Sequence, residues 1–354
     1  MSKKVIKGIF LFLAIAATIT VLVWGVLFVA RLLLAFENDA SVSALDRISV
    51  DTKADVPVDD IRLNVLVMGN DEASGLSDML MLVSYNMTAE SVSILQIPRD
   101  TYAEYTSKNY RKINGAVAAL GSEEALCSFL SEATCIDIDY YISLDLDAFS
   151  NIVDLIGGVE VNIPFDMNYD DPAQDLSIHL KKGKTLLDGD MARQFVRYRS
   201  GYTEGDLGRI DAQKIFLAAL VKKLKSDSSI LDISAVALSL IGDVKTNIPL
   251  SNVYMLVKDA MAVLPQNIRF VTLAGEGAVA TASGASYYVV SRTSAIEIVN
   301  EFFGAKADED SFDAKRVFLN EKYDSFKDIY YSRADYEIYD ASALISEGID
   351  IARK

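Results

Sequence analysis

A long apolar run near the N-terminus stands apart from the pattern of the rest of the chain. Residues 8–30 contain no charged side chain, and only Thr18 and Thr20 interrupt their apolar character. A helix of about 23 residues, rising about 1.5 Å per residue, reaches roughly 34 Å, which is enough to cross a hydrocarbon core of about 30 Å. We therefore expect residues 8–36 to form one transmembrane signal-anchor helix. The alternative is a cleaved signal peptide, but its apolar region is normally only about 7–15 residues long.

The charges that flank this run predict its orientation. Lys3, Lys4 and Lys7 precede it, whereas Glu37 and Asp39 follow it. Basic residues are retained on the cytoplasmic side of a membrane. We therefore expect a cell-membrane protein that crosses once, with residues 1–7 in the cytoplasm and the remainder extracellular. Residues 37–60 are polar and acidic with no hydrophobic period, which is typical of a linker.

After residue 60 the pattern becomes that of a globular domain. Short β-branched runs bounded by turn formers predict strands, and apolar positions at helical spacing predict helices. The expected strands are 61–69, 79–86, 91–97, 140–144, 159–163, 268–273 and 287–290, and the expected helices are 114–134, 148–156, 188–197, 206–225, 231–241, 250–263 and 294–303. Strands mixed with helices in this order predict an α/β fold, an αβα layered sandwich with a mixed central sheet.

Two further segments complete the expected organisation. Residues 164–184 are predicted to form a long polar loop, although the pattern of the short stretch around His179 predicts a strand. We then expect residues 61–305 to form one globular domain. Residues 306–354 form a C-terminal extension whose role the sequence leaves open.

Charge and composition exclude several classes of protein. The net charge is −16, and because residues 1–36 carry four basic residues and no acidic one, the rest of the chain has a net charge of −20. Nucleic-acid binding needs clustered Lys and Arg, so this class is excluded. One histidine and two cysteines make a zinc site improbable. The chain also lacks the Gly-x-Ser-x-Gly elbow and the phosphate-binding loop of nucleotide-dependent enzymes.

The two cysteines, Cys127 and Cys135, lie eight residues apart and outside the predicted anchor. In an oxidising compartment we expect them to form a disulfide that joins the end of one helix to the next element. The alternative is two unrelated buried thiols.

An acidic pair follows the first predicted strand. Asp71 lies near the end of that strand, and Asp78 comes seven residues later, next to Ser77. Two carboxylates at such a position can share Mg²⁺, which prefers oxygen ligands. Alternatively, each aspartate caps a turn by accepting a hydrogen bond from nearby backbone amides.

Arginines with suitable spacing form the strongest chemical signal. Asp206, Arg209 and Gln213 are spaced so that they share one face of the predicted helix. Arg197 and Arg199 can point the same way only if the preceding helix ends near Arg197, because residues two apart in a helix lie on nearly opposite faces.

The guanidinium group donates two parallel hydrogen bonds and stays charged at any ordinary pH, so converging arginines suit phosphate. Arg99, which follows Pro98 at the exit of a strand, can join them. In so acidic a domain these residues predict a positive pocket for a pyrophosphate with Mg²⁺. The alternative is that each arginine pairs with a neighbouring acid, as Arg99 would with Asp100.

Taken together and in order, the motifs resemble those of the LytR-CpsA-Psr family. They are Asp71 with Ser77-Asp78, Pro98-Arg99-Asp100, Lys112-Ile113-Asn114, Ile156-Gly157-Gly158-Val159-Glu160, Leu187-Asp188-Gly189, Arg197-Tyr198-Arg199 and Gly205-Asp206-x-x-Arg209-x-x-x-Gln213. The resemblance covers about residues 61–305. It implies a membrane-anchored, Mg²⁺-dependent phosphotransferase that moves a glycopolymer such as teichoic acid or capsule. The polymer passes from an undecaprenyl-pyrophosphate carrier onto peptidoglycan through a phosphodiester link.

The resemblance also implies roles for single residues. Asp71 and Asp78 match the family's Mg²⁺-linked aspartates. The pyrophosphate-binding positions are matched by Arg99, Arg197, Arg199, Arg209 and Gln213. Asp78, Asp100 and Asp206 are the available candidates for a general base. One departure is Ala212, which stands where the family has an arginine, so one positive charge is absent.

Two other functions are compatible with the same residues. A pyrophosphatase would act on the same lipid-linked substrate with water as the acceptor. A non-enzymatic envelope regulator would bind the lipid-linked sugar without turning it over, and Ala212 is the feature that favours it.

Overall fold

The computed structural model describes residues 61–71, 75–105, 111–172, 176–226, 244–249, 259, 261–281, 283–314, 317–318 and 324–349. The predicted anchor at 8–36, the linker at 37–60, the helix at 231–241 and most of that at 250–263 lie outside these residues. Within the described ranges no helix is long and apolar enough to span a membrane.

A mixed sheet forms the centre of the fold, as predicted, and it has seven strands, of which the short ones at 244–246 and 338–340 were not predicted. Its strands are β1 (Arg62–Asp71), β2 (Leu76–Asn86), β3 (Ser91–Gln96), β4 (Tyr140–Asp145), β9 (Val244–Thr246), β10 (Ile268–Thr272) and β13 (Ile338–Asp340), in the order β13-β10-β3-β2-β1-β4-β9. β1 pairs in parallel with β4, and β3 with β10, whereas the other neighbours are antiparallel. Because β1 and β3 both run antiparallel to β2, they end at the same edge of the sheet.

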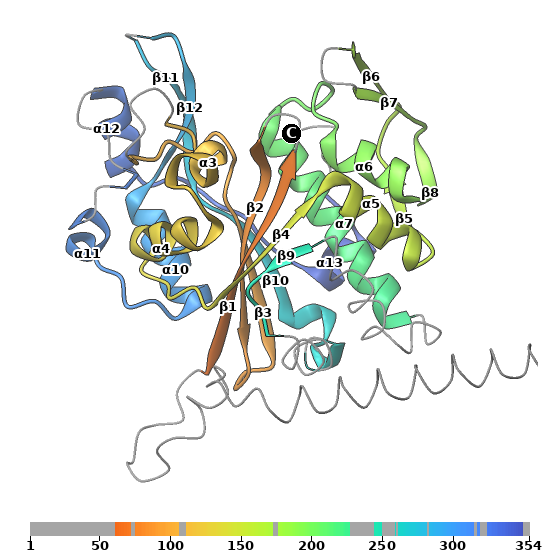
Figure 1. The fold of residues 1–354 in the computed structure, drawn as a ribbon, viewed down its shortest axis with the longest axis horizontal. Helices are drawn as coiled ribbons and strands as arrows, with labels where there is room; N and C mark the ends of the chain where they lie inside the picture. Colours follow the sequence, from red (N-terminus) through yellow and green to blue (C-terminus); the bar gives the residue numbers. More distant parts are fainter. Residues whose placement is uncertain are drawn as a thin grey trace, which may run out of the picture. The chain divides into compact units, whose positions relative to one another are not determined.

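Helices cover both faces of this sheet (Figure 1). One side carries η1 (Ile113–Gly115), α3 (Ala116–Leu120), α4 (Glu123–Thr134), α10 (Arg292–Phe303), α11 (Glu309–Ala314) and α12 (Asp324–Tyr331). The other carries α5 (Leu146–Leu155), α6 (Gly189–Arg197), α7 (Asp206–Ser226) and α13 (Ala341–Ser346), with η3 (Pro265–Asn267) preceding β10. One face of the sheet packs in an apolar cluster around Leu66, Leu126 and Phe302, and the other face in a cluster around Ile94 and Phe270. A separate cluster around Phe195 and Phe216 joins α5, α6 and α7.

The predicted helix at 114–134 is two helices rather than one. Gly121 adopts a left-handed conformation with φ of 96° and ends α3. Ser122 then caps α4, its hydroxyl accepting a hydrogen bond from Ala125 N at 3.1 Å. A hydroxyl at this position satisfies one of the backbone amides that a new helix leaves free.

The prediction of a loop at 164–184 is also wrong. It contains β6 (Met167–Asp171) and β7 (Leu176–Leu180), which pair with each other, and the start of β8 (Gly183–Leu187), which pairs with β5 (Val159–Ile163). Met167, Ile178 and Leu180 are buried while alternate positions face solvent, so the segment is an amphipathic hairpin. The polar side chains of its outer face conceal the strand pattern in the sequence. His179 lies in a strand, as expected.

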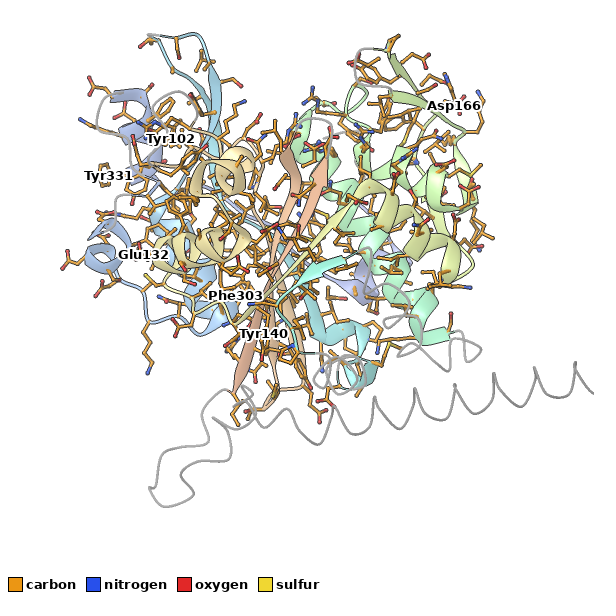
Figure 2. All side chains as sticks on the ribbon, viewed as in Figure 1. Tyr102, Glu132, Tyr140, Asp166, Phe303 and Tyr331 are labelled. Carbon is orange, nitrogen blue, oxygen red and sulfur yellow. The ribbon has the colours of Figure 1, made fainter. Side chains whose placement is uncertain are left out.

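The described part of the C-terminal segment is built into the same fold. β13 pairs with β10 at the edge of the central sheet, and Phe312, Phe326 and Tyr330 are buried in the apolar cluster beside α10. Tyr102, labelled in Figure 2, packs its ring edge-on against Phe326 with the centroids 5.5 Å apart. A third small sheet, β11 (Gly275–Val279) with β12 (Ser286–Val290), lies beside α12; β11 was not predicted.

The structure contradicts the predicted disulfide, because Cys127 and Cys135 are both free. Cys127 lies within α4, and Cys135 is the residue that ends this helix. Eight residues of helix separate their Cα atoms by about 12 Å. A disulfide requires about 4.4–6.8 Å.

We expect the two thiols to differ strongly in reactivity. Burial, helped by Glu124 and Glu123, raises the pKa of Cys127 to about 11, so little thiolate forms at neutral pH. Cys135 is only half-buried. Iodoacetamide at pH 7.5 should therefore alkylate Cys135 of the folded full-length protein at least about tenfold faster than Cys127. Mass spectrometry of peptides measures both rates, and a Cys127–Cys135 disulfide or equal labelling would contradict the structure.

Candidate active site

The predicted site residues meet at one edge of the central sheet. β1 ends there at Asp71, β2 begins there with Asp78 near its start, and Arg99 follows the end of β3. α6 ends and α7 begins beside this edge, which brings Arg197, Arg199 and Arg209 from the other part of the chain.

Asp78 lies in a β-bulge rather than in a loop. Gly69 pairs with Met79 and Asn70 with Ser77, so Asp78 is the extra residue between them. A bulge re-aims the side chain that it carries. Beside it, Ser77 Oγ donates to Asn70 Oδ1 at 2.7 Å, and Asn70 Nδ2 donates to Ser143 Oγ at 2.7 Å, which holds the bulge in place.

Arg99 is held by three carboxylates. Its Nη1 donates to Asp78 Oδ1 at 2.5 Å, and its Nε lies 3.5 Å from Asp206 Oδ1 and 4.0 Å from Asp100 Oδ1. Burial by itself would lower the pKa of Arg99, but these carboxylates outweigh it and the pKa is raised. Asp100 in turn forms an ion pair with Lys112, with Nζ 3.0 Å from Oδ1.

Arg209 lies deeper, with only 4% of its surface exposed. Its Nη2 is 2.8 Å from Asp206 Oδ1 and donates to the backbone carbonyl of Asp78 at 3.3 Å. Burial lowers the pKa of Arg209, and the positive charges of Arg99 and Arg199 act in the same direction. Asp206 and Asp78 oppose this, so the buried arginine is stabilised by the carboxylates around it.

Arg197 and Arg199 complete the pocket as the sequence predicted. α6 ends at Arg197, and Tyr198 has an extended ψ of 136°, so Arg199 lies in non-helical chain and points toward the same space. Gly205, with φ of 57°, then allows the turn into α7. Among the described residues the side chains of Arg197 and Arg199 have no ion-pair or hydrogen-bond partner.

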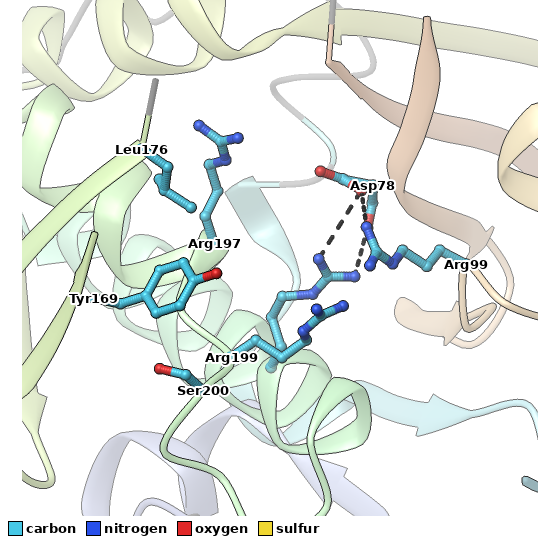
Figure 3. Close-up of a pocket in the computed structure, with 8 residues that line it drawn as sticks. Asp78, Arg99, Tyr169, Leu176, Arg197, Arg199 and Ser200 are labelled. Atoms are coloured by element: carbon cyan, nitrogen blue, oxygen red, sulfur yellow. Dashed lines mark hydrogen bonds and ion pairs between the residues drawn. The ribbon is translucent and has the colours of Figure 1, made fainter. Parts of the chain in front are cut away.

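These side chains line a pocket with a volume of about 160 Å³ (Figure 3). Its lining residues are Asp78, Arg99, Tyr169, Leu176, Arg197, Arg199, Ser200 and Arg209. Arg99 and Arg209 are balanced by Asp78 and Asp206, whereas Arg197 and Arg199 add two positive charges that no carboxylate of the described residues compensates. The pocket is therefore suited to a ligand with more than one negative charge.

Two predicted binding residues do not line this pocket. Gln213 is buried one turn behind Arg209, donates to the Val196 carbonyl at 3.3 Å and accepts from Gln96 Nε2 at 3.4 Å. Its side chain therefore links α7 to α6 and to β3 by hydrogen bonds. Asp71 ends β1 opposite Leu76 and is likewise outside the lining.

Ala212 is fully buried in the apolar cluster with Phe195 and Phe216. Its side chain thus faces away from the pocket, and the arginine that the family resemblance implies at this position would have to enter the core. The alanine at this position therefore removes no charged side chain from the lining of the pocket.

Sequence reasoning missed Tyr169, Leu176 and Ser200. Tyr169 and Leu176 come from the β6–β7 hairpin, whose residues we expected to form a loop. An aromatic residue in a segment of alternating polarity is the sequence signal that could have indicated the two hairpin residues. This signal can be used only when the register of the hairpin is known, because the register decides which face each side chain occupies.

The oxygen donors at the bulge fit a divalent cation. One carboxylate oxygen of Asp78 points away from Arg99 (Figure 3), and Asp71 lies at the end of the neighbouring strand. No group of three or more His, Cys, Asp or Glu side chains able to hold a metal occurs in the described ranges. Mg²⁺ commonly binds through one or two carboxylates and completes its coordination with water and substrate phosphates, so two aspartates suffice.

Comparison with known proteins gives consistent results. Residues 34–303 match the model of the LytR_cpsA_psr family. The chain is 32% identical over 243 residues to the polyisoprenyl-teichoic acid–peptidoglycan teichoic acid transferase TagU of Bacillus mycoides, covering 68% of this chain and 77% of that protein. It is 31% identical over 257 residues to the corresponding transferase TagV of Bacillus subtilis, covering 70% and 65%.

Solved structures with similar folds include two related proteins. The crystal structure of Bacillus subtilis TagV superposes with a TM-score of 0.59 at 26% identity, covering 70% of this chain and 98% of that chain. The structure of TagT bound to LIIa-WTA superposes with a TM-score of 0.57 at 25% identity, covering 72% and 94%.

Proposed function

The chain belongs to the LytR-CpsA-Psr family, and from this we propose that it is a phosphotransferase that moves a glycopolymer from a polyprenyl-diphosphate carrier onto peptidoglycan. The relatives named above carry names that describe this reaction with teichoic acid as the polymer. One observation of this chain supports the proposal most strongly. The side chains of Arg197 and Arg199, unpaired within the described part of the chain, line one pocket together with Asp78, Arg99 and Arg209.

The proposed step is an attack of an acceptor sugar hydroxyl on the phosphorus that bears the polymer. A new P–O bond forms to the acceptor, whose hydroxyl proton passes to a carboxylate of the site, the bond from that phosphorus to the bridging oxygen breaks, and polyprenyl phosphate leaves with the electron pair. The arginines neutralise the charge that builds on the leaving phosphate, so catalysis is mainly electrostatic and positional. Of the three carboxylates considered as bases, Asp78 is the one that lines the pocket, whereas Asp100 is paired with Lys112.

Mg²⁺ belongs to this proposal as a cofactor. Asp71 and Asp78 would hold it, and when bound it would supply positive charge next to the two phosphates. This chain's own part is to present the carboxylate of Asp78 from the bulge while its other oxygen orients Arg99.

We also propose that the enzyme is held in the cell membrane by residues 8–36 with its catalytic domain outside. The uncharged run at 8–30 and the lysines before it support this placement. It would bring the pocket to the compartment in which peptidoglycan and lipid-linked polymer meet.

A transfer assay with Arg197→Ala tests the function. Full-length protein in detergent is incubated with a synthetic polyprenyl-diphosphate-linked glycopolymer and peptidoglycan, and polymer bound to peptidoglycan is quantified. We expect Arg197→Ala and Arg199→Ala each to lower transfer by about 10²-fold, because each removes a donor to the developing charge. Their thermal unfolding should change little, because neither has a partner among the described residues.

The matched control is Arg193→Ala. Arg193 lies one turn earlier on α6, is paired with Asp147 and Asp190 on the surface, and does not line the pocket. It should transfer normally. Retention of near-normal transfer by Arg197→Ala, Arg199→Ala and Arg99→Ala together would contradict the assignment. Donor consumption that does not depend on peptidoglycan would show a hydrolase instead.

A further inference from the structure

The hairpin formed by β6 and β7 has two faces of different chemistry. On the inner face, Met167, Ile178 and Leu180 are almost completely buried. On the outer face, Ser177 Oγ donates to Asp170 Oδ1 at 2.7 Å, and His179 Nε2 lies 3.2 Å from the same carboxylate oxygen. At one end of the hairpin, Asp166, labelled in Figure 2, accepts from Lys181 Nζ at 2.9 Å.

The inner face of the hairpin extends beyond the apolar core to the pocket that Arg99, Arg197, Arg199 and Arg209 line. Tyr169 follows Met167 by two residues and pairs with Ile178, so it lies on the buried side of the strand. Yet it is 37% exposed, and it lines the pocket together with Leu176. A core-facing position that ends in an exposed ring beside arginines indicates contact with a ligand rather than with the protein's own interior.

The position of these two side chains relative to the charges is specific. Figure 3 shows Tyr169 and Leu176 on the side of Arg197, across the pocket from Asp78 and Arg99. Among the described residues, Tyr169 OH makes only a long hydrogen bond, 3.4 Å to Asp171 Oδ2, and the side chain lines the pocket. A group attached to one phosphate of a bound diphosphate would therefore reach the hairpin.

We propose that Tyr169 and Leu176 form the wall that binds the sugar joined to the donor's diphosphate. This rests on the proposed function and assigns a residue pair to donor specificity. One aromatic ring with one aliphatic neighbour matches the size of a sugar ring, whose C–H face packs on an aromatic face while its hydroxyls stay hydrated. It is too small an apolar surface to sequester a polyprenyl chain, which needs burial of many methylene groups.

Two probes that differ only by a sugar test this proposal. Full-length protein in detergent with MgCl₂ is titrated with farnesyl diphosphate and with farnesyl diphosphate carrying one N-acetylglucosamine on its terminal phosphate. Tyr169→Ala should weaken binding of the glycosylated probe by about three- to tenfold and leave farnesyl diphosphate unchanged. Tyr169→Phe should bind both like the wild type, because the ring is retained.

Tyr331→Ala is the matched control, because Tyr331 is another exposed tyrosine, 49% accessible, outside the pocket lining. It should bind both probes normally. Equal weakening of both probes by Tyr169→Ala, no weakening of either, or equal wild-type affinity for the two probes would each overturn the sugar-wall assignment while leaving the diphosphate site intact. If the wild type bound neither probe, the proposed function would fail as well, and the sugar wall with it.

Discussion

Replacing Arg209 with alanine is expected to abolish transfer and to destabilise the fold at the same time. Arg209 is buried against Asp206 at 2.8 Å and lies 4.0 Å from Asp78. Removing one partner of a buried charge network leaves carboxylates without compensation, which typically costs about 3–5 kcal/mol. Transfer should fall by about 10²–10³-fold, because a preorganised donor is lost from the transition state.

The two effects can be separated with a second substitution. In Arg209→Ala with Asp206→Ala, one unpaired carboxylate is also removed, so part of the lost free energy of unfolding should return while transfer stays low. Arg209→Lys keeps the charge but not the planar fork and should retain intermediate activity. Denaturant unfolding and the transfer assay measure both quantities. Normal stability with near-normal transfer in Arg209→Ala would remove this residue from the site.

Replacing Asp78 with asparagine is expected to tighten pyrophosphate binding when divalent cations are absent and to lower transfer when Mg²⁺ is present. Asp78 Oδ1 engages Arg99 Nη1 at 2.5 Å, so in a chelator the carboxylate competes with a phosphate for this guanidinium. The neutral amide should release it, and pyrophosphate should bind about tenfold more tightly than to the wild type in chelator. Transfer should nevertheless fall by about 10²-fold, and added Mg²⁺ should no longer improve binding.

Calorimetric titration with pyrophosphate, with and without MgCl₂, measures this difference. Asp190→Asn is the control, since Asp190 is an exposed partner of Arg193 outside the pocket, and it should behave like the wild type. Chelation of divalent cations should abolish wild-type transfer, and Asp78→Ala should mimic chelation. Wild-type activity in chelator would exclude a metal role for both Asp71 and Asp78.

Predictions from the sequence succeeded where the feature depends on residues that are close together along the chain. The face shared by Asp206 and Arg209 follows from helical spacing, and the structure confirms it with an ion pair between them. The end of α6 at Arg197 was also predicted, because two arginines spaced by two residues can share a ligand only outside a helix.

Other predictions failed where distant contacts decide the outcome. The β6–β7 hairpin was missed because its outer face carries Asn168, Asp170 and Ser177, whose polarity resembles that of a loop. The Cys127–Cys135 pair was proposed without knowing that a single helix would hold the two thiols apart. Asp78 was placed in a loop because a bulge is defined by the register of two strands, which the sequence of one strand does not reveal.

The sequence by itself determined five of the central strands, β1, β2, β3, β4 and β10, the acidic balance of the chain and the identity of the arginines, because periodicity and side-chain chemistry are local properties. Only the tertiary structure decided which arginines remain unpaired and which side chains complete the pocket. Pairing depends on three-dimensional distance. Arg99 and Arg209 meet carboxylates from other elements, whereas Arg197 and Arg199 meet none among the described residues. Tyr169 likewise lines the pocket only because β6 pairs with β7, which places its side chain on the inner face of the hairpin.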